Sequence, residues 1–288
     1  MKLSAFLCAA ALAVSATAQT PSGMVDMYVV KVKPDKRMDF DAVGKKIAEA
    51  NRKHKGDNWI AYGTEYGEQN TVMFASIREN YAAIDKGAEL FMGAMKEAYG
   101  PPFMKLFQDM SNCTSSSRGE LRRRRMDLSW NVPGGQPEVE KMVGQSRWLR
   151  IVTVRVRSGH NGSYEETLKA LKAGFEKGPN RNAGLVSQSA AGTPNGIYYV
   201  TTFAKSLADY DPAPNAPPLQ EILGQRGFAM FTKSSADDVI STEWDIARLL
   251  PELSNPPEGI ANADPAFWNP KPAAPPKMKP AAPAKTGN

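Results

Sequence analysis

The chain has 288 residues, of which 36 are lysine or arginine and 30 are aspartate or glutamate, so its net charge at neutral pH is +6. Hydrophobic residues make up 42% of the sequence, and the length of the chain suits one large domain or two modules of about 110 residues. The sequence also lacks the stretch of about 18 uncharged apolar residues that a membrane-spanning helix needs.

Residues 1–18 have the pattern of a secretory signal peptide. Lys2 provides a positive start, Leu3–Val14 form a short apolar stretch rich in alanine, and Ala16–Ala18 match the A-x-A cleavage signal. We therefore expect an exported protein, periplasmic or secreted, whose mature chain begins after residue 18. Cys113 is then the single cysteine of the mature chain and has no partner for an internal disulfide, so we expect a buried thiol or a loop position without function.

Residues 19–130 contain a regular succession of strand and helix patterns. The predicted elements are a strand (Met24–Lys33), a helix (Met38–Lys53), two strands joined by a turn (Asn58–Glu65 and Thr71–Ile77), a helix (Tyr81–Tyr99), a second helical piece (Phe103–Met110), a serine-rich loop (Ser111–Gly119) and a last strand (Leu121–Trp130).

Residues 147–261 repeat the same succession, displaced by about 124 residues, after a Pro/Gly-rich linker at 131–146. The predicted elements are a strand (Trp148–Arg157), a helix (Tyr164–Glu176) capped by Ser163, two strands (Leu185–Ser189 and Ile197–Phe203), a helix that begins at Leu219–Gly224 and a last strand (Val239–Ile246). Residues 262–288 are rich in proline, alanine and lysine and predict a disordered tail.

Each repeat therefore has the order β-α-β-β-α-β of a ferredoxin-like unit, in which both helices cover one face of an antiparallel sheet. The free faces of the two sheets can be buried against each other, which predicts an α+β fold made of two tandem ferredoxin-like repeats. In this element order the chain resembles the dimeric α+β barrel superfamily in a fused, pseudo-dimeric form. That superfamily includes NIPSNAP-like proteins, antibiotic-biosynthesis monooxygenases and haem-degrading enzymes. The resemblance implies a fold and a cavity; it identifies no activity.

Strand alternation indicates where a ligand could bind. The uniformly apolar face of each first strand should meet the helices, and the mixed face should meet the other repeat. We expect the candidate ligand-binding residues to lie between the repeats, at Val29, Lys31, Tyr62, Glu65, Thr153, Arg155 and Tyr199. The alternative for Lys31 and Arg155 is that they are solvated charges at strand ends.

The run Arg122–Arg125 is the most prominent charge cluster. Alternation along a strand would point Arg122 and Arg124 one way and Arg123 and Arg125 the other, which divides the cluster. The last strand of the second repeat is acidic, so we expect ion pairs between the repeats, with anion binding as the alternative and nucleic acid as the least favoured partner.

Neither histidine, His54 or His160, has a partner at metal-ligand spacing, so the sequence predicts no metal site and no cofactor, although the resemblance leaves haem open. The leading functional hypothesis is an exported protein that binds a small apolar or mixed ligand between the repeats. The alternatives are a cofactor-independent monooxygenase or haem-handling enzyme, and a non-catalytic envelope protein whose lysine-rich tail contacts an anionic surface.

Overall fold

The computed structural model describes residues 23–178, 182–212 and 214–269. The first half, repeat 1, contains β1 (Met24–Val32), η1 (Pro34–Lys36), α1 (Arg37–Lys53), β2 (Ile60–Tyr66), β3 (Thr71–Arg78), α2 (Tyr81–Tyr99), α3 (Phe103–Asn112) and β4 (Thr114–Arg124). The second half, repeat 2, contains β5 (Trp148–Val156), α5 (Asn161–Lys177), β6 (Leu185–Ala191), β7 (Ile197–Ala204), η2 (Leu207–Tyr210), α6 (Leu219–Asp237) and β8 (Val239–Leu249). Helix α4 (Gln136–Gly144) lies between the repeats, and η3 (Pro251–Leu253), α7 (Glu258–Ala263) and α8 (Pro265–Trp268) follow them.

The eight strands form one closed barrel in the order β1-β3-β2-β8-β5-β7-β6-β4. Each repeat contributes four neighbouring strands, and the repeats join where β2 pairs with β8 and where β4 pairs with β6, both antiparallel. Closure leaves no strand edge exposed along the sheet. The α+β fold expected from the sequence, with its pseudo-dimeric barrel, is confirmed.

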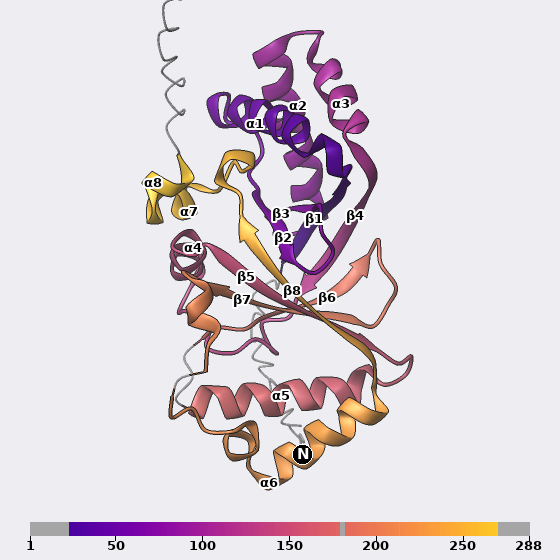
Figure 1. Ribbon diagram of the computed structural model, residues 1–288, viewed down its shortest axis with the longest axis vertical. Coiled ribbons are helices and arrows are strands. Elements are labelled where there is room, and N and C mark those ends of the chain that lie inside the picture. Colours follow the sequence, from indigo (N-terminus) through magenta and orange to yellow (C-terminus); the bar gives the residue numbers. More distant parts are fainter. Residues whose placement is uncertain (1–22, 179–181, 213, 270–288) are drawn as a thin grey trace, which may run out of the picture.

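Helices cover the barrel at two opposite ends (Figure 1). Helices α1–α3 lie over the strands of repeat 1, α5 and α6 lie over those of repeat 2, and α4, α7 and α8 gather on one flank between them. Three apolar cores result: one beneath α1–α3, one beneath α5, and one inside the barrel that α4, α7 and α8 help to close.

The predicted strand faces are confirmed. On β1, Val30 and Val32 belong to the core beneath the helices, whereas Val29 belongs to the barrel core. On β5, Val154 faces the helices and Ile151 faces the barrel interior. The period-2 alternation of a strand is sufficient to assign both faces, because each face is buried against a different layer.

Other boundaries differ from the prediction. Thr114–Gly119, within the serine-rich segment expected to be a loop, form the first part of β4, because they pair along β1 from Val32 to Tyr28. Ser163 does not cap α5. The helix begins at Asn161, and the Ser163 hydroxyl donates instead to Asp238 Oδ2 at 2.8 Å.

The ends of the two repeats also hold structure that the sequence did not indicate. The segment expected to be a linker contains α4, and the segment after 262 continues through α8, where Trp268 is fully buried and donates from Nε1 to the Gly144 carbonyl at 2.8 Å. One large indole therefore ties the chain end to α4. The remaining tail, residues 270–288, and the predicted signal peptide lie outside the described residues. Among the described residues no helix is both long and apolar enough to cross a bilayer.

Candidate functional site

A large cavity lies in repeat 1, between the outer face of the sheet and helices α1–α3. This space, which we call the repeat 1 cavity, has a volume of about 410 Å³. Its wall is dominated by aromatic rings, with the chief members Tyr28, Phe40, Trp59, Phe74, Phe91 and Phe107. A volume of this size lies within the range of pockets that hold small organic molecules.

Two features of the chain shape this space. Gly44 lines the cavity from α1 without a side chain. Helix α2 stops at Gly100, whose φ of 60° lies in the left-handed region, and Pro101–Pro102 separate it from α3. Aromatic residues of the two helices meet across this break, and the Phe91 and Phe107 rings are stacked with their centroids 6.0 Å apart.

One end of the repeat 1 cavity is polar. Arg78 on β3 donates from both terminal nitrogens to the Asp57 carboxylate, at 2.7 and 2.6 Å, and from Nε to Asp26 at 3.3 Å. All three residues line the cavity. The hydrogen bonds from Asp57 raise the pKa of Arg78 despite burial, so the guanidinium stays charged. Two carboxylates against one guanidinium leave a net negative end, which favours a ligand group that donates hydrogen bonds.

Gly87 on α2 permits this arrangement. A Cβ at Gly87 would lie 2.5 Å from a terminal nitrogen of Arg78. The guanidinium therefore passes directly against the helix backbone, where any other residue would displace it.

A second cavity, which we call the barrel cavity, lies inside the barrel and measures about 140 Å³. Strands of both repeats line it together with α4 and α7. Its wall is mostly apolar, and the exceptions include Tyr62, Arg122 and Arg124.

A buried ionic cluster stands beside the barrel cavity. Glu120 is 2% exposed and accepts hydrogen bonds from Arg122 Nη2 at 2.6 Å and from Arg118 Nε at 2.7 Å. Burial opposes ionisation of Glu120, but the two guanidinium groups outweigh it and hold its pKa below the ordinary value. The Arg122 guanidinium also stacks on Tyr199, 3.5 Å from the ring centroid.

The structure separates the seven residues expected to bind a ligand. Val29, Tyr62 and Tyr199 lie in the barrel core, and among the seven Tyr62 lines the barrel cavity. The others lie farther along their strands: Thr153 is half-buried, Glu65 and Arg155 are exposed, and Lys31 pairs with Glu68 at 2.7 Å. Their ligand-binding role stays a prediction.

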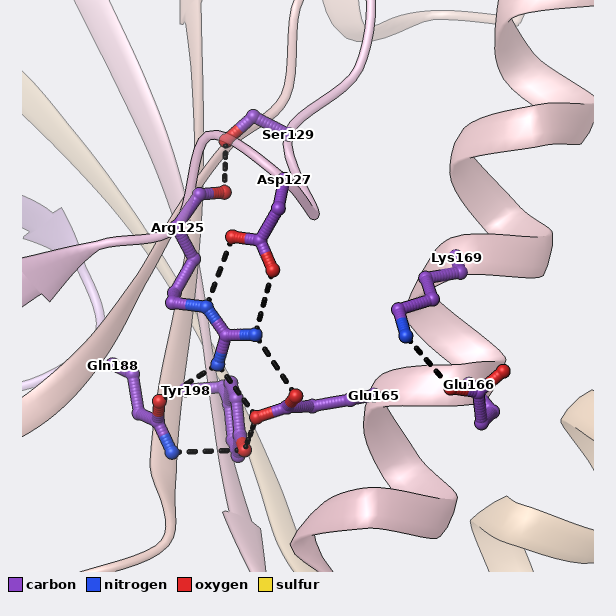
Figure 2. Close-up of polar contacts among 8 residues, drawn as sticks. All are labelled: Arg125, Asp127, Ser129, Glu165, Glu166, Lys169, Gln188 and Tyr198. Atoms are coloured by element: carbon purple, nitrogen blue, oxygen red, sulfur yellow. Dashed lines mark hydrogen bonds and ion pairs between the residues drawn. The ribbon is translucent and has the colours of Figure 1, made fainter. Parts of the chain in front are cut away.

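The arginine run divides as alternation predicts. Arg122 and Arg124 line the barrel cavity, whereas Arg125 leaves the strand on the helix side and binds Asp127 and Glu165 (Figure 2). The Arg125–Glu165 contact does join the two repeats, but the expected pairs with the acidic last strand are wrong. Strands β4 and β8 are not neighbours in the barrel, and Asp238 binds His160 instead.

Neither cavity offers a histidine to a haem. His54 Nδ1 contacts Glu97 at 2.8 Å, His160 Nδ1 contacts Asp238 at 2.7 Å, and neither ring lines the repeat 1 or the barrel cavity. The residues at these cavities therefore do not fit a histidine-ligated haem. Within the described ranges no group of three His, Cys, Asp or Glu side chains could hold a metal ion.

The sequence prediction missed five residues of the two polar clusters: Asp26, Asp57, Arg78, Arg118 and Glu120. A signal for Glu120 was present, because Arg118, Glu120 and Arg122 alternate on one strand face and so predict a mutually paired row. No such signal exists for Asp57 and Arg78, which lie 21 positions apart and meet through the fold.

No family model matches the chain, and no curated protein matches it. Solved structures do. A candidate monooxygenase from Fusobacterium nucleatum is 10% identical, with a TM-score of 0.50 over 80% of this chain and 93% of that one. A candidate monooxygenase from Lactobacillus acidophilus is 9% identical, with a TM-score of 0.48 over 82% of this chain and 97% of that one. A haem-binding protein from Thermus thermophilus is 12% identical, with a TM-score of 0.41 over 81% of this chain and 93% of that one. At these identities the likeness concerns the fold alone.

Proposed function

We propose that this protein binds a small, largely aromatic organic molecule in the repeat 1 cavity. The supporting observation is the cavity itself: about 410 Å³, walled by aromatic rings and ending at the Asp26–Arg78–Asp57 cluster. Aromatic walls favour a flat apolar body, and a net negative end favours a hydroxyl, amine or other donor on that body. This proposal keeps the ligand class expected from the sequence and moves its main site from the barrel interior to the space beneath the helices.

We also infer that the protein works outside the cytoplasm, on the strength of the signal-peptide pattern in residues 1–18. Intact mass measurement of the protein from its own host tests this inference. A chain that begins after residue 18 supports export, and a chain that retains Lys2 contradicts it.

Ligand binding is tested by native mass spectrometry of the same preparation, followed by a blocked variant. Ser117 lies at the exposed rim of the repeat 1 cavity on β4, so Ser117→Trp should fill the entrance. Its neighbour Ser116 is exposed on the same strand but does not line the cavity, so Ser116→Trp is the matched control. We expect a retained organic mass with wild type and Ser116→Trp and its loss with Ser117→Trp. Equal retention by both variants would place the ligand elsewhere.

A second candidate function is cofactor-independent oxidation of such a ligand, favoured by the position of Asp26. This carboxylate lines an aromatic cavity, and its side chain remains 30% exposed because only one contact, from Arg78 Nε, engages it. A carboxylate so placed can take a proton from the acidic C–H group of a substrate such as anthrone. O₂ then oxidises the resulting carbanion, one oxygen atom ending in the quinone product and the other in water. Oxygen consumption with anthrone, present in wild type and lost in Asp26→Asn, would support it. No consumption by wild type would leave a binding protein.

A further inference from the structure

The barrel cavity has an apolar body that neither repeat forms alone. Ile60 and Leu149 contribute from the barrel strands of the two repeats, and Val139 and Ile260 close it from α4 and α7. Val139, Leu149 and Ile260 belong to the fully buried barrel core. The cavity reaches the surface at Ile77 and Met126, whose side chains are partly exposed, so a small molecule has a route to it.

Two arginines on one face of β4 border this apolar space. Arg122 is 7% exposed, and its Nε and Nη2 donate to Glu120 at 3.0 and 2.6 Å. Its Nη1 makes no hydrogen bond within the described part of the chain. Arg124, two residues on, has no carboxylate within ion-pair distance among the described residues; the one hydrogen bond of its guanidinium among them is from Nη2 to Met126 Sδ at 3.8 Å. Burial lowers the pKa of Arg124, which reflects a half-buried cation without a counter-charge.

The nearby carboxylates do not supply that counter-charge. Glu120 is shared between Arg118 and Arg122. Glu140 lines the cavity from α4, but it accepts a hydrogen bond from Gln136 at 3.1 Å and is not paired with Arg124. The lining therefore carries two guanidinium groups against one carboxylate, and its net charge is positive.

The volume limits the size of any ligand. A cavity of about 140 Å³ is close to the roughly 150 Å³ that holds one benzene ring in an apolar protein interior. A long acyl chain or a nucleotide is too large.

We propose that the barrel cavity is a second binding site, for a small organic anion whose apolar body is one ring or a short branched chain and whose carboxylate binds Arg124 and Arg122. The apolar body lies against Ile60 and Leu149, and the carboxylate supplies the acceptor oxygens that the free N–H groups lack. This site is separate from the repeat 1 cavity and differs from it in the sign of its charge.

Benzoate is the probe, and benzamide is the uncharged analogue of the same shape. Both are titrated up to about 10 mM into the full chain, and binding is followed by methyl NMR. We expect benzoate to shift the methyl signals of Leu149 and Ile260 in the barrel cavity and to leave those of Ile47, which lines the repeat 1 cavity, unchanged. Benzamide should bind at least about tenfold more weakly, because it cannot pair with the guanidinium groups.

Arg124→Gln is the decisive variant and Arg123→Gln its matched control, since Arg123 is exposed and does not line the cavity. We expect Arg124→Gln to weaken benzoate about tenfold and Arg123→Gln to leave it unchanged. Without benzoate, Arg124→Gln should be at least as stable to heat as wild type, because it removes an unpaired buried charge, so loss of binding cannot be ascribed to unfolding.

Absence of benzoate binding to wild type, equal binding by the two variants, or benzamide binding as tightly as benzoate would each overturn the proposal. Ser117→Trp should leave benzoate binding intact, which keeps this site distinguishable from the repeat 1 cavity.

Discussion

The two repeats have the same element order but differ in how the space between their helices and the sheet is packed. In repeat 1 this space is a cavity of about 410 Å³. In repeat 2, Tyr164, Leu168 and Tyr198 are buried beneath the helix in one core. Gly44 on α1 and Leu168 on α5 are displaced by the same 124 residues that separate the starts of these helices, Arg37 and Asn161. The comparison teaches that the same backbone arrangement can enclose a cavity or a packed core, depending on side-chain volume at a few equivalent positions.

Charge is also distributed differently between the repeats. Glu120 on β4 lies opposite Met27 on β1, and Asp245 on β8 lies opposite Ile151 on β5, so the two carboxylates are equivalent in the barrel. Glu120 is paired with arginines and its pKa is lowered, whereas burial raises the pKa of Asp245, which has no ion-pair partner among the described residues. The polar interior of the barrel is therefore built chiefly by repeat 1.

The largest expected effect tests the packing of repeat 2. Leu168 is 1% exposed, so Leu168→Ala should lower the free energy of unfolding by about 3 kcal/mol, by lost burial and by the new cavity. At the equivalent position of repeat 1, Gly44→Ala places a Cβ 2.9 Å from the flexible end of Leu253 and should cost less than about 1 kcal/mol. Urea denaturation measures both. Equal costs would show that the two spaces are packed alike.

A similar effect is expected for the buried carboxylate of repeat 1. Glu120→Gln leaves Arg122 buried with a neutral partner and should cost about 3 kcal/mol. Asp245→Asn removes a carboxylate that burial disfavours and should be neutral or stabilising by a few tenths of a kcal/mol. Thermal unfolding of the two variants compares them directly. A larger loss for Asp245→Asn would contradict the assignment of the polar interior to repeat 1.

A smaller effect is expected where the repeats meet outside the barrel. The Arg125–Glu165 pair, supported by Tyr198 and Gln188, is partly exposed (Figure 2). A double-mutant cycle with Arg125→Met and Glu165→Gln should give a coupling energy of about 1 kcal/mol. In repeat 1 the equivalent helix position, Asp41, pairs with Arg37 on its own helix, and Asp41→Asn should cost no more than about 0.5 kcal/mol. A coupling energy too small to measure would show that the Arg125–Glu165 ion pair does not stabilise the folded protein.

The smallest effect at neutral pH is expected for Tyr62. Its hydroxyl contacts only Met27 Sδ at 3.8 Å, so Tyr62→Phe should change stability by less than about 0.5 kcal/mol at pH 7, whereas Tyr198→Phe, which loses the bond to Glu165, should cost about 1 kcal/mol. Burial raises the pKa of Tyr62 to about 12, above the value of about 10 in an unfolded chain.

The folded state therefore keeps this proton when the unfolded chain has lost it. The contribution of the Tyr62 proton to the free energy of unfolding is complete below pH 10. It is lost as the pH rises from about 10 to about 12, at up to about 1.4 kcal/mol per pH unit. Tyr62→Phe should make the alkaline decline less steep by about one proton, and Tyr66→Phe, on an exposed ring, is the control. Urea denaturation at several pH values between 9 and 11.5, a range set by these pKa values, measures the slope; an unchanged slope would show that Tyr62 does not retain its proton.

Local patterns predicted the elements well where side-chain periodicity was strong. The whole of α2, the start of β1 and the start of β5 were predicted to the residue, and the strand faces followed from alternation. The prediction failed at β4, whose serines show no apolar alternation because that part of the strand is largely exposed, and at α8, whose burial depends on one indole at a distant carbonyl. All seven candidate residues were expected between the repeats; the structure has three of them in the barrel core, and none lines the repeat 1 cavity.

By itself, the sequence determined the α+β class, the doubled element order and which faces of β1 and β5 meet the helices and the barrel interior, because these depend on periods of 2 and 3.6 residues within single elements. Tertiary structure alone decided that β2 meets β8 and β4 meets β6, that Asp57 meets Arg78, and that the space beneath the helices holds a cavity in one repeat and a packed core in the other. These features depend on many contacts between residues that are distant in the sequence. The volume and charge of each partner matter only when the barrel has formed and brought the partners together.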